Sequence, residues 1–579
     1  MTNYILGLNA YHGDSSACIY KGTELIAATE EERIVRVKHW AGLPINAIKF
    51  CLDEAGITLT DVDVITVSRD PKAKIGEKII QTLKKGISLK AVKDRGSNQL
   101  KITRIKSDIA EALGYAAGDI KAKLYFAEHH RSHMASSFFV SPFDEAAILS
   151  IDGMGDFSST MRGTGKGNKM DVLDSVSYPH SIGIFYTAFT QYLGFPHYGD
   201  EYKVMGLSPY GKANMVDKVE DILRLKDNGL FELNGDFFKH FKEGVAMDWE
   251  GGSPSIDSIF SNAFVELFGP ARQKGDELTQ YHKDLAASVQ RHTENAIFHM
   301  AEDLQKRTGL KNLCITGGVA QNSVSNGKLL ANTSFERLFV PPAGHDAGTS
   351  VGSALYYIHQ ELNTSRPEFE HQAYTGAQFS NEEIGNFLQG KESIVQYYEK
   401  DEDLIENVAQ LLQDGNVIGW FQGRAEFGPR ALGNRSIIVD PSRSDTKDLL
   451  NSKIKRRESF RPFAPSILKD AVDEYFEVND DVPFMEKVYK IRKERHDIIP
   501  AVTHVDGTGR LQTVEERDNP RYYKLIKRFS EKSGIPILLN TSFNENEPIV
   551  NDPSHAYDCF ARTDMDILVL GNYVVKRAR

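Results

Sequence analysis

Short apolar runs separated by polar turns recur along the chain, and stretches with helical spacing lie between them. Apolar runs bounded by Gly, Asp, Ser or Pro are typical of β-strands. The predicted strands cover residues 4–8, 17–20, 24–29, 62–67, 124–127, 146–151, 313–316, 417–421 and 536–539. Apolar residues repeat with helical spacing over residues 44–55, 284–305 and 403–413. The chain is therefore predicted to be an α/β protein.

The length of the chain predicts more than one domain. A chain of 579 residues is too long for a single hydrophobic core. A polar linker over residues 362–372 separates a domain over residues 1–365 from a second domain over residues 373–579. Residues 72–106 are locally basic and are predicted to form a mostly helical insertion with a solvated face.

Composition excludes several classes of protein. Hydrophobic residues make up 41% and charged residues 26% of the chain, as in ordinary globular proteins. The net charge of −11 argues against a protein that coats nucleic acid. The four cysteines are far apart in apolar contexts, which favours buried thiols in a reducing compartment. The chain lacks a basic, apolar leader at its start and has no run of about 18 apolar residues, so we expect a cytoplasmic protein without a membrane partner.

An arginine-rich loop, residues 423–435, follows the predicted strand at 417–421. It carries Arg424, Arg430 and Arg435 among three glycines and Pro429. The planar guanidinium group of arginine binds pairs of phosphate or carboxylate oxygens. We expect Pro429 to begin a helix whose N-terminus completes an anion site. A second basic block covers residues 453–461, and a Ser/Thr/Asn loop follows the strand at 536–539. So many cations indicate a site for two polyanions at once.

Histidines and carboxylates form a second group of candidates. His129 and His133 are four residues apart and share one face of a predicted helix. Asp152 ends the strand at 146–151, and Asp346 lies between a strand and an Ala/Gly-rich helix. Two imidazoles on one helical turn, with carboxylates at strand ends, suit a divalent transition metal with open positions. The residue types allow iron, zinc or manganese.

Two further turns carry candidate functional residues. His12 lies among small polar residues in the turn after the first strand, where it can act as a general base or only bond the turn. Gly317-Gly318 lies at a strand-to-helix turn and offers backbone N–H groups to a nucleotide.

Several of these motifs resemble one family. Residues 423–435 match Gly-Arg-x-Glu-x-Gly-Pro-Arg-Ala-Leu-Gly-x-Arg, which resembles the signature of the NodU/CmcH family of O-carbamoyltransferases. Residues 455–465 match Lys-x-Arg-Glu-x-x-Arg-Pro-Phe-Ala-Pro, and residues 203–211 match Lys-Val-Met-Gly-Leu-x-Pro-Tyr-Gly. Asp-Glu-Tyr precedes the latter block where the family has Glu-Gly. Matching motifs run from residue 7 to residue 550.

The resemblance implies a fold and an activity. The N-terminal domain would have the actin/Hsp70-like (ASKHA) fold of the tRNA threonylcarbamoyl transferase, and the C-terminal domain would be YrdC-like. The enzyme would form carbamoyl adenylate from carbamoyl phosphate and ATP, with ATP bound as its Mg²⁺ complex. It would then carbamoylate a hydroxyl of a small-molecule acceptor. The resemblance suggests iron(II) as a Lewis acid, allows a homodimer, and leaves the acceptor open among sugars and antibiotics.

The resemblance also assigns residues to these roles. Catalysis would involve His12 and Lys38. The metal ligands would be His129, His133, Asp152 and Asp346. The nucleotide of the N-terminal domain would bind Gly317, Gly318 and Asn322. Carbamoyl phosphate and ATP in the C-terminal domain would bind Arg424, Arg430, Lys455, Arg457, Arg461, Arg510, Asn540 and Ser542.

Two alternatives belong to other classes. A tRNA threonylcarbamoyl-type enzyme is expected to have a broad basic surface, which the net charge disfavours. A kinase or ATP-binding protein of the actin/Hsp70 class needs neither the His-x-x-x-His motif nor the arginine-rich loop.

Overall fold

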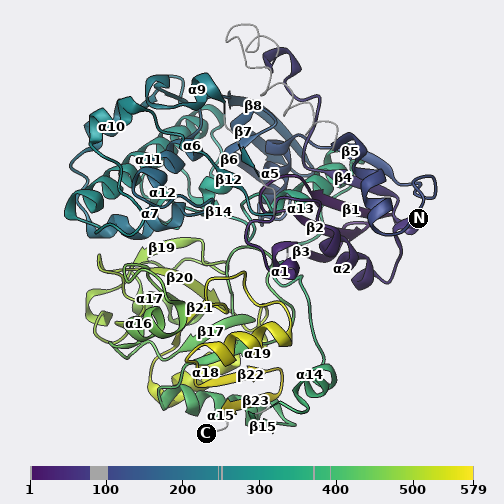
Figure 1. Cartoon of the computed structure of the whole chain (residues 1–579), viewed down its shortest axis with the longest axis vertical. Helices are drawn as coiled ribbons and strands as arrows, with labels where there is room; N and C mark the ends of the chain where they lie inside the picture. The colour runs from purple at the N-terminus through teal and green to yellow at the C-terminus, as the bar shows by residue number, and fades with distance from the viewer. Residues whose placement is uncertain are drawn as a thin grey trace. The chain divides into compact units, whose positions relative to one another are not determined.

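The computed structural model describes residues 3–78, 102–244, 247–248, 252–369, 372–391 and 393–577. The helical insertion predicted over 72–106 lies mostly outside these residues. The described chain forms two compact units, one of residues 1–325 and 329–370 and the other of residues 326–328 and 371–579 (Figure 1). No described helix is both long enough and apolar enough to span a bilayer.

The N-terminal unit contains two five-stranded sheets with the same topology. In each sheet three antiparallel strands are extended by two parallel strands. The first sheet has the order β3-β2-β1-β4-β5, with β1 (Tyr4–Asn9), β2 (Ser16–Lys21), β3 (Glu24–Glu30), β4 (Val64–Val67) and β5 (Lys123–Phe126). The second has the order β8-β7-β6-β13-β14, with β6 (Glu145–Gly155), β7 (Ser158–Lys166), β8 (Lys169–Ser177), β13 (Asn312–Thr316) and β14 (Arg337–Phe339). This duplicated arrangement confirms the predicted actin/Hsp70-like class.

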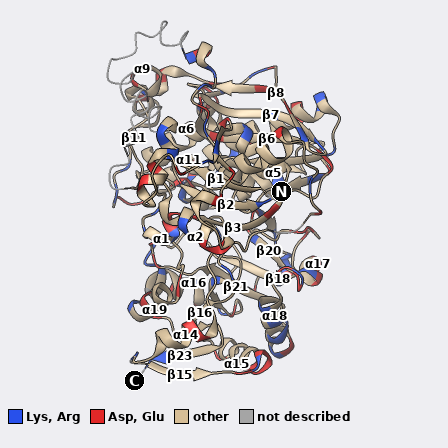
Figure 2. Cartoon of the chain, turned by 90° about the vertical axis from the view of Figure 1, so that its right-hand side faces the viewer, with Lys and Arg blue, Asp and Glu red and all other residues tan. Residues whose placement is uncertain are grey.

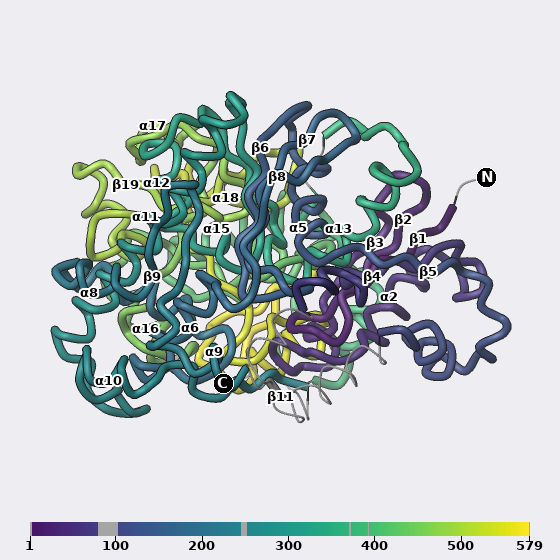
Figure 3. The backbone as a smooth tube through the Cα atoms, turned by 90° about the horizontal axis from the view of Figure 1, so that it is seen from above, coloured from purple at the N-terminus to yellow at the C-terminus, as the bar shows by residue number. Residues whose placement is uncertain are grey.

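Two helices lie between the sheets. Helix α13 (Gly348–Leu355) packs on β1, β2 and β4, and it also packs on α5 (His129–Phe138), which contacts β6, β7 and β13. Figures 1 and 3 show α5 and α13 side by side. Every residue of α13 is buried, because its Gly, Ala and Ser residues allow close approach to both neighbours. Residues at the ends of these helices and strands therefore meet in one place.

Other helices cover the outer faces of the N-terminal unit. Helix α2 packs on β2 and β3, whereas α6 packs on β6 and on the long helix α11. Other elements of this unit are α1 (Glu32–Val35), α2 (Ile45–Ala55), α6 (Ile182–Tyr192), α7 (Glu201–Leu207), α8 (Val216–Glu220), β9 (Leu223–Leu225), β10 (Phe231–Leu233), α9 (His240–Glu243), β11 (Met247–Asp248), β12 (Ser255–Ile256), α10 (Asn262–Phe268), α11 (Gln280–Thr308) and α12 (Ser323–Leu329).

The C-terminal unit is built on one mixed sheet of nine strands. Its order is β15-β23-β22-β16-β17-β21-β18-β20-β19. The strands are β15 (Ser393–Tyr397), β16 (Ile418–Phe421), β17 (Arg435–Val439), β18 (Ala464–Leu468), β19 (Lys487–Lys490), β20 (Thr508–Val514), β21 (Ile537–Ser542), β22 (Ile567–Leu570) and β23 (Tyr573–Arg577). The helices are α14 (Asn381–Leu388), α15 (Asp401–Gln413), α16 (Thr446–Leu449), α17 (Val472–Tyr475), α18 (Pro520–Ser533) and α19 (Pro553–Arg562).

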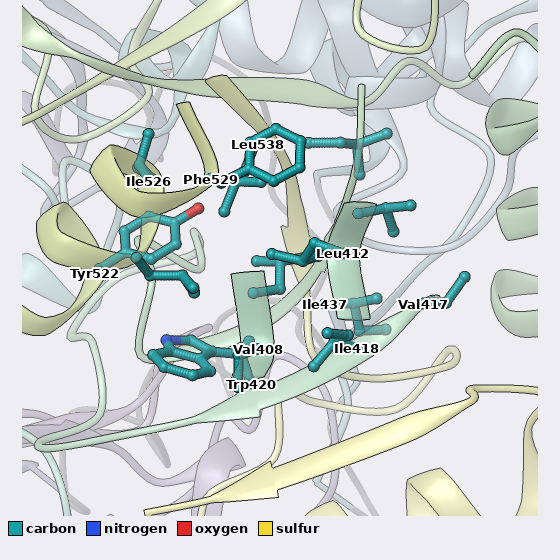
Figure 4. Close-up of a cluster of buried hydrophobic side chains, with 14 of the residues drawn as sticks. Val408, Leu412, Val417, Ile418, Trp420, Ile437, Tyr522, Ile526, Phe529 and Leu538 are labelled. Atoms are coloured by element: carbon teal, nitrogen blue, oxygen red, sulfur yellow. The ribbon is translucent and has the colours of Figure 1, made fainter. Parts of the chain in front are cut away.

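Apolar stripes on the helices fill the core of this unit. In α15, apolar residues recur on one face and pack with α18. Figure 4 shows Val408 and Leu412 of α15 near Trp420 of β16, with Tyr522 and Phe529 of α18 in the same cluster. Trp420 is fully buried, and its indole N–H donates to Gly433 O at 2.9 Å, which ties the arginine-rich loop to the core.

The predicted strands and helices are present within a few residues of their expected ends. One expectation is wrong. Pro429 begins no helix, because residues 422–434 form a loop that connects the antiparallel strands β16 and β17. The Glu426 carboxylate accepts the N–H groups of Leu432, Asn434 and Arg435. These bonds hold the loop in a non-helical conformation, so any anion site here depends on side chains and not on a helix N-terminus.

Candidate functional site

Four side chains converge between the two sheets of the N-terminal unit. His129 and His133 lie one turn apart on α5, Asp152 lies near the end of β6, and Asp346 precedes α13. All four are buried, and one ligand atom from each lies within 4.8 Å of the others. The Nε2 atoms of His129 and His133 lie 3.1 and 3.3 Å from Asp152 Oδ2. His133 Nε2 also lies 3.3 Å from Asp346 Oδ1.

Local backbone features orient these side chains. The pairing of β6 with β7 is irregular between Ile151 and Gly155, which releases Asp152 from the regular ladder. A Cβ atom on Gly155 would lie 1.9 Å from His129 Cδ2, so only glycine leaves room for that ring. The Glu128 carboxylate caps α5 by accepting the Arg131 N–H at 2.8 Å.

The charges of the cluster balance one another. Burial by itself would raise the pKa of Asp152, but hydrogen bonds from His129 and His133 hold that pKa well below its usual range. Burial lowers the pKa of His133, and its bonds to Asp152 and Asp346 outweigh this and raise the pKa to about 9. Ionised carboxylates and converging imidazole nitrogens in a buried site fit a divalent cation, and they do not select iron over zinc or manganese.

His12 joins this cluster from the turn after β1. Its Nδ1 lies 2.7 Å from Asp346 Oδ2, and its ring centroid lies 5.1 Å from that of His129. Burial lowers the pKa of His12, but the Asp346 carboxylate outweighs burial, so the pKa is raised. The His12 side chain is 18% exposed, whereas those of His129 and His133 are 0% exposed. His12 is therefore the histidine of this group that an external molecule can reach.

The second predicted catalytic residue differs from the buried cluster in its exposure. Lys38 is exposed. Its neighbour His39 instead faces the turn that carries His12, with Nδ1 at 2.7 Å from Asp14 Oδ1. Burial lowers the pKa of His39, but the charge of Asp14 and their hydrogen bond raise it to about 9. Sequence analysis missed this pair, although Asp14 stands only two residues after His12.

The predicted nucleotide turn contacts the metal cluster directly. Gly318 N–H donates to Asp152 Oδ1 at 3.0 Å. Gly317 has a φ of +92°, and a Cβ there would lie 2.2 Å from Ile151 O. Asn322 caps α12 by accepting the Ser325 N–H at 3.0 Å, so its side chain shapes the turn. The turn thus orients the Asp152 side chain, in addition to offering its own backbone N–H groups to a nucleotide.

Four of the predicted arginines gather in the C-terminal unit. Burial lowers the pKa of Arg430 to about 10. Burial and the charges of Arg430, Arg457 and Arg461 hold the pKa of Arg510 well below its usual range. Among the described residues, no carboxylate influences the pKa of Arg430 or Arg510. Arg461 has Glu458 at 3.7 Å, which leaves a net positive cluster. Such an arrangement can be stabilised by a bound polyanion.

The other predicted C-terminal residues support this cluster. Lys455 Nζ is buried and donates to Asn544 Oδ1 at 2.7 Å and to Asn544 O at 2.8 Å. Asn544 Oδ1 also accepts from Ser542 Oγ at 2.8 Å. Arg424 donates to two carbonyl groups, those of Thr375 and Gly376. Asn540 Nδ2 lies 2.9 Å from Gln512 Oε1. Lys455, Arg424 and Asn540 thus hold loops, whereas the side chains of Arg430 and Arg510 make no hydrogen bond or ion pair within the described part of the chain.

Sequence analysis also missed Glu426. Its carboxylate is buried, and Oε1 lies 2.7, 2.8 and 3.2 Å from the N atoms of Leu432, Asn434 and Arg435. These bonds fix the loop on both sides of Arg430. The signal was present in the matched motif, where glutamate lies four residues before this arginine.

Known proteins match both units. Residues 4–355 match the family described as "Carbamoyltransferase N-terminus", and residues 409–577 match "Carbamoyltransferase C-terminus". An uncharacterised protein of Synechocystis is 42% identical, with 99% of this chain and 97% of that protein covered. Nodulation protein NolNO of Sinorhizobium fredii is 38% identical, with coverage of 98% and 80%. The 3'-hydroxymethylcephem-O-carbamoyltransferase of Amycolatopsis lactamdurans is 27% identical, with coverage of 78% and 80%.

Proposed function

Because the chain belongs to the carbamoyltransferase family, we propose that it is an ATP-dependent O-carbamoyltransferase with two chemically distinct sites. The C-terminal unit, which we take to be YrdC-like, forms carbamoyl adenylate. The N-terminal unit transfers the carbamoyl group to a hydroxyl of a small molecule. The observation that carries the proposal is the buried arginine cluster around Arg510, in which cations outnumber carboxylates.

The first reaction needs a site for several phosphates. Water hydrolyses carbamoyl phosphate to carbamate and inorganic phosphate, and a carbamate oxygen then attacks the α-phosphorus of ATP. The bond to pyrophosphate breaks, which leaves carbamoyl adenylate. Arg430 and Arg510 have the charge to bind these phosphates, and the Ser542 hydroxyl at the end of β21 is a further candidate ligand. Magnesium would accompany the ATP phosphates.

The second reaction needs a base near the carbamoyl carbon. An acceptor oxygen forms a bond to that carbon, the bond to the AMP oxygen breaks, and the acceptor proton must be removed. His12 Nδ1 lies 2.7 Å from Asp346 Oδ2, and its Nε2 lies 3.3 Å from Met154 O. In the neutral ring with Nδ1 protonated, Nε2 would take the acceptor proton once the acceptor hydroxyl replaces the Met154 carbonyl as its neighbour. A divalent metal held by His129, His133, Asp152 and Asp346 would polarise the carbamoyl oxygen as a Lewis acid.

The N-terminal unit also supplies a place for the adenylate. Gly317 and Gly318 form a turn beside Asp152, so a nucleotide on this turn would lie close to the metal cluster. This proximity favours transfer in this unit. The bond from Gly318 to Asp152 would couple nucleotide binding to the orientation of a metal ligand.

The acceptor is proposed to be a small molecule rather than tRNA. In the cartoon of Figure 2, Lys and Arg positions alternate with Asp and Glu positions along the described chain, and the net charge is −11. A polynucleotide partner would favour a continuous basic surface. The related cephem enzyme is named for transfer to a hydroxymethyl group, which supports an alcohol as the acceptor here.

The two-site proposal is tested by separating the two reactions. Arg430→Ala and Ser542→Ala should abolish pyrophosphate formation from ATP and carbamoyl phosphate. Losing one buried cation of a polyanion site typically costs about 2–5 kcal/mol, and Ser542→Ala removes a hydroxyl proposed to bind phosphate. Both variants should still carbamoylate the acceptor when supplied with carbamoyl adenylate. The control is Arg517→Ala, which removes an arginine that is 68% exposed and paired with Glu515. Equal loss in both assays would show a single active site.

A further inference from the structure

One arginine lies beside the metal cluster without an acidic partner. Arg69 follows β4, and its Nη1 donates to Tyr11 O at 2.9 Å. Tyr11 directly precedes His12, so this bond holds the guanidinium at the turn that carries the proposed base. Arg69 Nε is buried and has no hydrogen-bond partner. Over the described ranges of the chain, the bond to Tyr11 is the one hydrogen bond of this side chain, and the guanidinium forms no ion pair.

The backbone next to Arg69 is fixed on its other side as well. Asp70 N–H donates to Asp156 Oδ2 at 2.7 Å, and the same oxygen accepts the His129 N–H at 3.0 Å. Asp156 therefore ties residue 70 to the start of α5, while Arg69 is tied to the turn that carries His12. The segment that carries the guanidinium is thus held between the proposed base and the helix that bears two of the candidate metal ligands.

The charges that act on Arg69 agree with this position. Burial lowers the pKa of Arg69, and the charges of Asp156 and Asp346 oppose that shift. The positive charge of Arg69 in turn acts to lower the pKa of His12. Asp346 is already paired with His12 Nδ1 at 2.7 Å, and Asp156 accepts two backbone N–H groups. Both carboxylates are thus engaged elsewhere, which leaves N–H groups of Arg69 for a bound anion.

A phosphate is the anion that the proposed transfer reaction brings to this place. Arg69 follows the C-terminal end of β4, which runs parallel to β1, and the Gly317–Gly318 turn follows the C-terminal end of β13, which runs parallel to β6. Ligands of α/β sheets bind at such strand ends. In the adenylate, one phosphate joins the nucleoside to the carbamoyl group. A nucleoside on the glycine turn and a carbamoyl carbon at the metal cluster would therefore place this phosphate between them.

We propose that Arg69 binds the phosphate of the carbamoyl adenylate and stabilises it as the leaving group. The inference rests on the proposed transfer of the carbamoyl group in this unit. The acceptor oxygen forms a bond to the carbamoyl carbon, and the bond from that carbon to the AMP oxygen breaks. The acceptor proton goes to His12, and the electron pair of the broken bond stays on the phosphate. Because negative charge grows on the phosphate, a bound cation stabilises the transition state more than the ground state.

Equilibrium binding of AMP and of adenosine tests this assignment. Every protein in the test carries Arg510→Met, which weakens phosphate binding at the arginine cluster of the C-terminal unit. Calorimetry should show that this protein binds AMP more tightly than adenosine. Adding Arg69→Gln should weaken AMP binding by about 10- to 100-fold and leave adenosine binding unchanged, because one guanidinium–phosphate contact is lost.

Two further variants separate charge from structure. Glutamine at position 69 keeps a side-chain N–H that can donate to Tyr11 O, so Arg69→Gln tests the charge. Arg69→Lys keeps the charge without the planar guanidinium and should give an intermediate AMP affinity. Arg131→Gln is the matched control, because Arg131 is also a half-buried arginine of this unit and donates from Nη1 to Tyr356 Oη at 3.1 Å. It should leave both affinities unchanged.

The possible failures are distinguishable. If Arg69→Gln weakened AMP and adenosine equally, or weakened neither, the assignment would be overturned and Arg69 would only hold the turn through Tyr11. If the Arg510→Met protein bound neither compound, the nucleotide would not belong to this unit, which would overturn the proposed transfer site together with the role of Arg69.

Transfer kinetics test the stabilisation of the leaving group. In the chain that retains Arg510, Arg69→Gln should lower kcat for transfer from supplied carbamoyl adenylate by about 10²-fold. Pyrophosphate formation from ATP and carbamoyl phosphate should continue, which shows that the C-terminal unit is intact. A higher KM with an unchanged kcat would overturn the leaving-group role, because the phosphate would then be bound equally in the ground and transition states.

Discussion

The two candidate sites use charge in opposite ways. In the N-terminal unit, His129 and His133 neutralise Asp152 and Asp346, and every ligand atom faces a partner of opposite character. In the C-terminal unit, Arg510 interacts chiefly with other arginines, and no described carboxylate offsets its charge. In the first site the charges are balanced without a ligand. In the second site the arginines repel one another, and a bound anion would relieve this repulsion.

This difference indicates what each site is built to do. A self-paired cluster keeps its geometry before a ligand arrives, so it suits a permanently held cation and a fixed base beside it. A cluster of unpaired cations is destabilising by itself, and it gains most when a polyanion binds. Removing one group should therefore have different consequences in the two units.

The largest effect is expected at the self-paired cluster. His133→Ala combined with Asp152→Asn removes one imidazole and one carboxylate from four converging ligands. Bound metal should be lost, and carbamoyl transfer should fall by about 10³-fold or more, because metal polarisation of a carbonyl is worth several kcal/mol. Elemental analysis of protein purified without oxygen measures the metal. His130→Ala is the control, since His130 is not one of the four converging ligands and its Nδ1 lies 2.8 Å from Ser150 Oγ. Full metal content in the double variant would refute the site.

A second substitution tests the base beside that cluster. His12→Asn keeps hydrogen-bonding capacity but cannot take a proton near pH 7. Transfer should fall by about 10²–10⁴-fold, while pyrophosphate formation continues in the C-terminal unit. Measuring both products in one reaction, with the adenylate hydrolysing in place of transfer, separates catalysis from folding. Near-normal transfer would leave His12 with only a structural role through its contacts with Asp346 and Met154 O.

A third substitution should show the opposite character of the arginine cluster. Arg510→Met removes a cation that is repelled by its neighbours, so the protein without anions should become more stable by roughly 1–2 kcal/mol. Pyrophosphate formation should be lost at the same time. Inorganic phosphate should raise the melting temperature of the wild type and have a smaller effect on the variant.

Arg162 provides the matched control for this comparison. It is fully buried but paired with Asp174 and Asp303, so Arg162→Met should lower stability. If Arg510→Met were destabilising to the same extent as Arg162→Met, the positive cluster would have a purely structural role.

Much of the fold followed from local patterns. Apolar runs and turn residues located the strands around both sites, and the four-residue spacing of His129 and His133 placed them on one face of α5. The duplicated sheet topology was not visible, because the sequence has no long internal repeat and strand order depends on contacts between distant segments. Two sheets can have the same topology without sharing a residue pattern, so hydrophobic periodicity alone does not reveal the duplication.

The sites were predicted less completely than the elements that carry them. Arginine is a typical anion ligand, so the arginines of the sequence indicated where the cluster lies. Residue type alone could not show that Arg424, unlike Arg430, donates to backbone carbonyls. Glu426 and the Asp14–His39 pair were missed because each depends on a long-range or turn geometry. The helix expected at Pro429 failed for the same reason, since the buried Glu426 carboxylate decides the path of that loop.

The smallest effect is expected at the Asp14–His39 pair, which repeats the chemistry of the metal cluster with a single carboxylate–imidazole contact. Asp14 raises the pKa of His39 to about 9, above the unfolded value of 6.5, so the proton on His39 stabilises the fold at low pH and this contribution is lost as the pH rises through about 9. The pKa of Asp14 is lowered below 3.8, so its contribution is present above that pH and is lost as the pH falls through the folded pKa.

The pair should therefore stabilise the protein between about pH 4 and pH 9. Urea unfolding of the wild type and of His39→Gln should differ by about 1–2 kcal/mol near pH 6, because the pair is partly buried. The difference should shrink near pH 10, where His39 is neutral in both states. A difference that stays constant across this range would mean that His39 contributes through packing against Tyr198, whose ring centroid lies 5.3 Å away, and not through its charge.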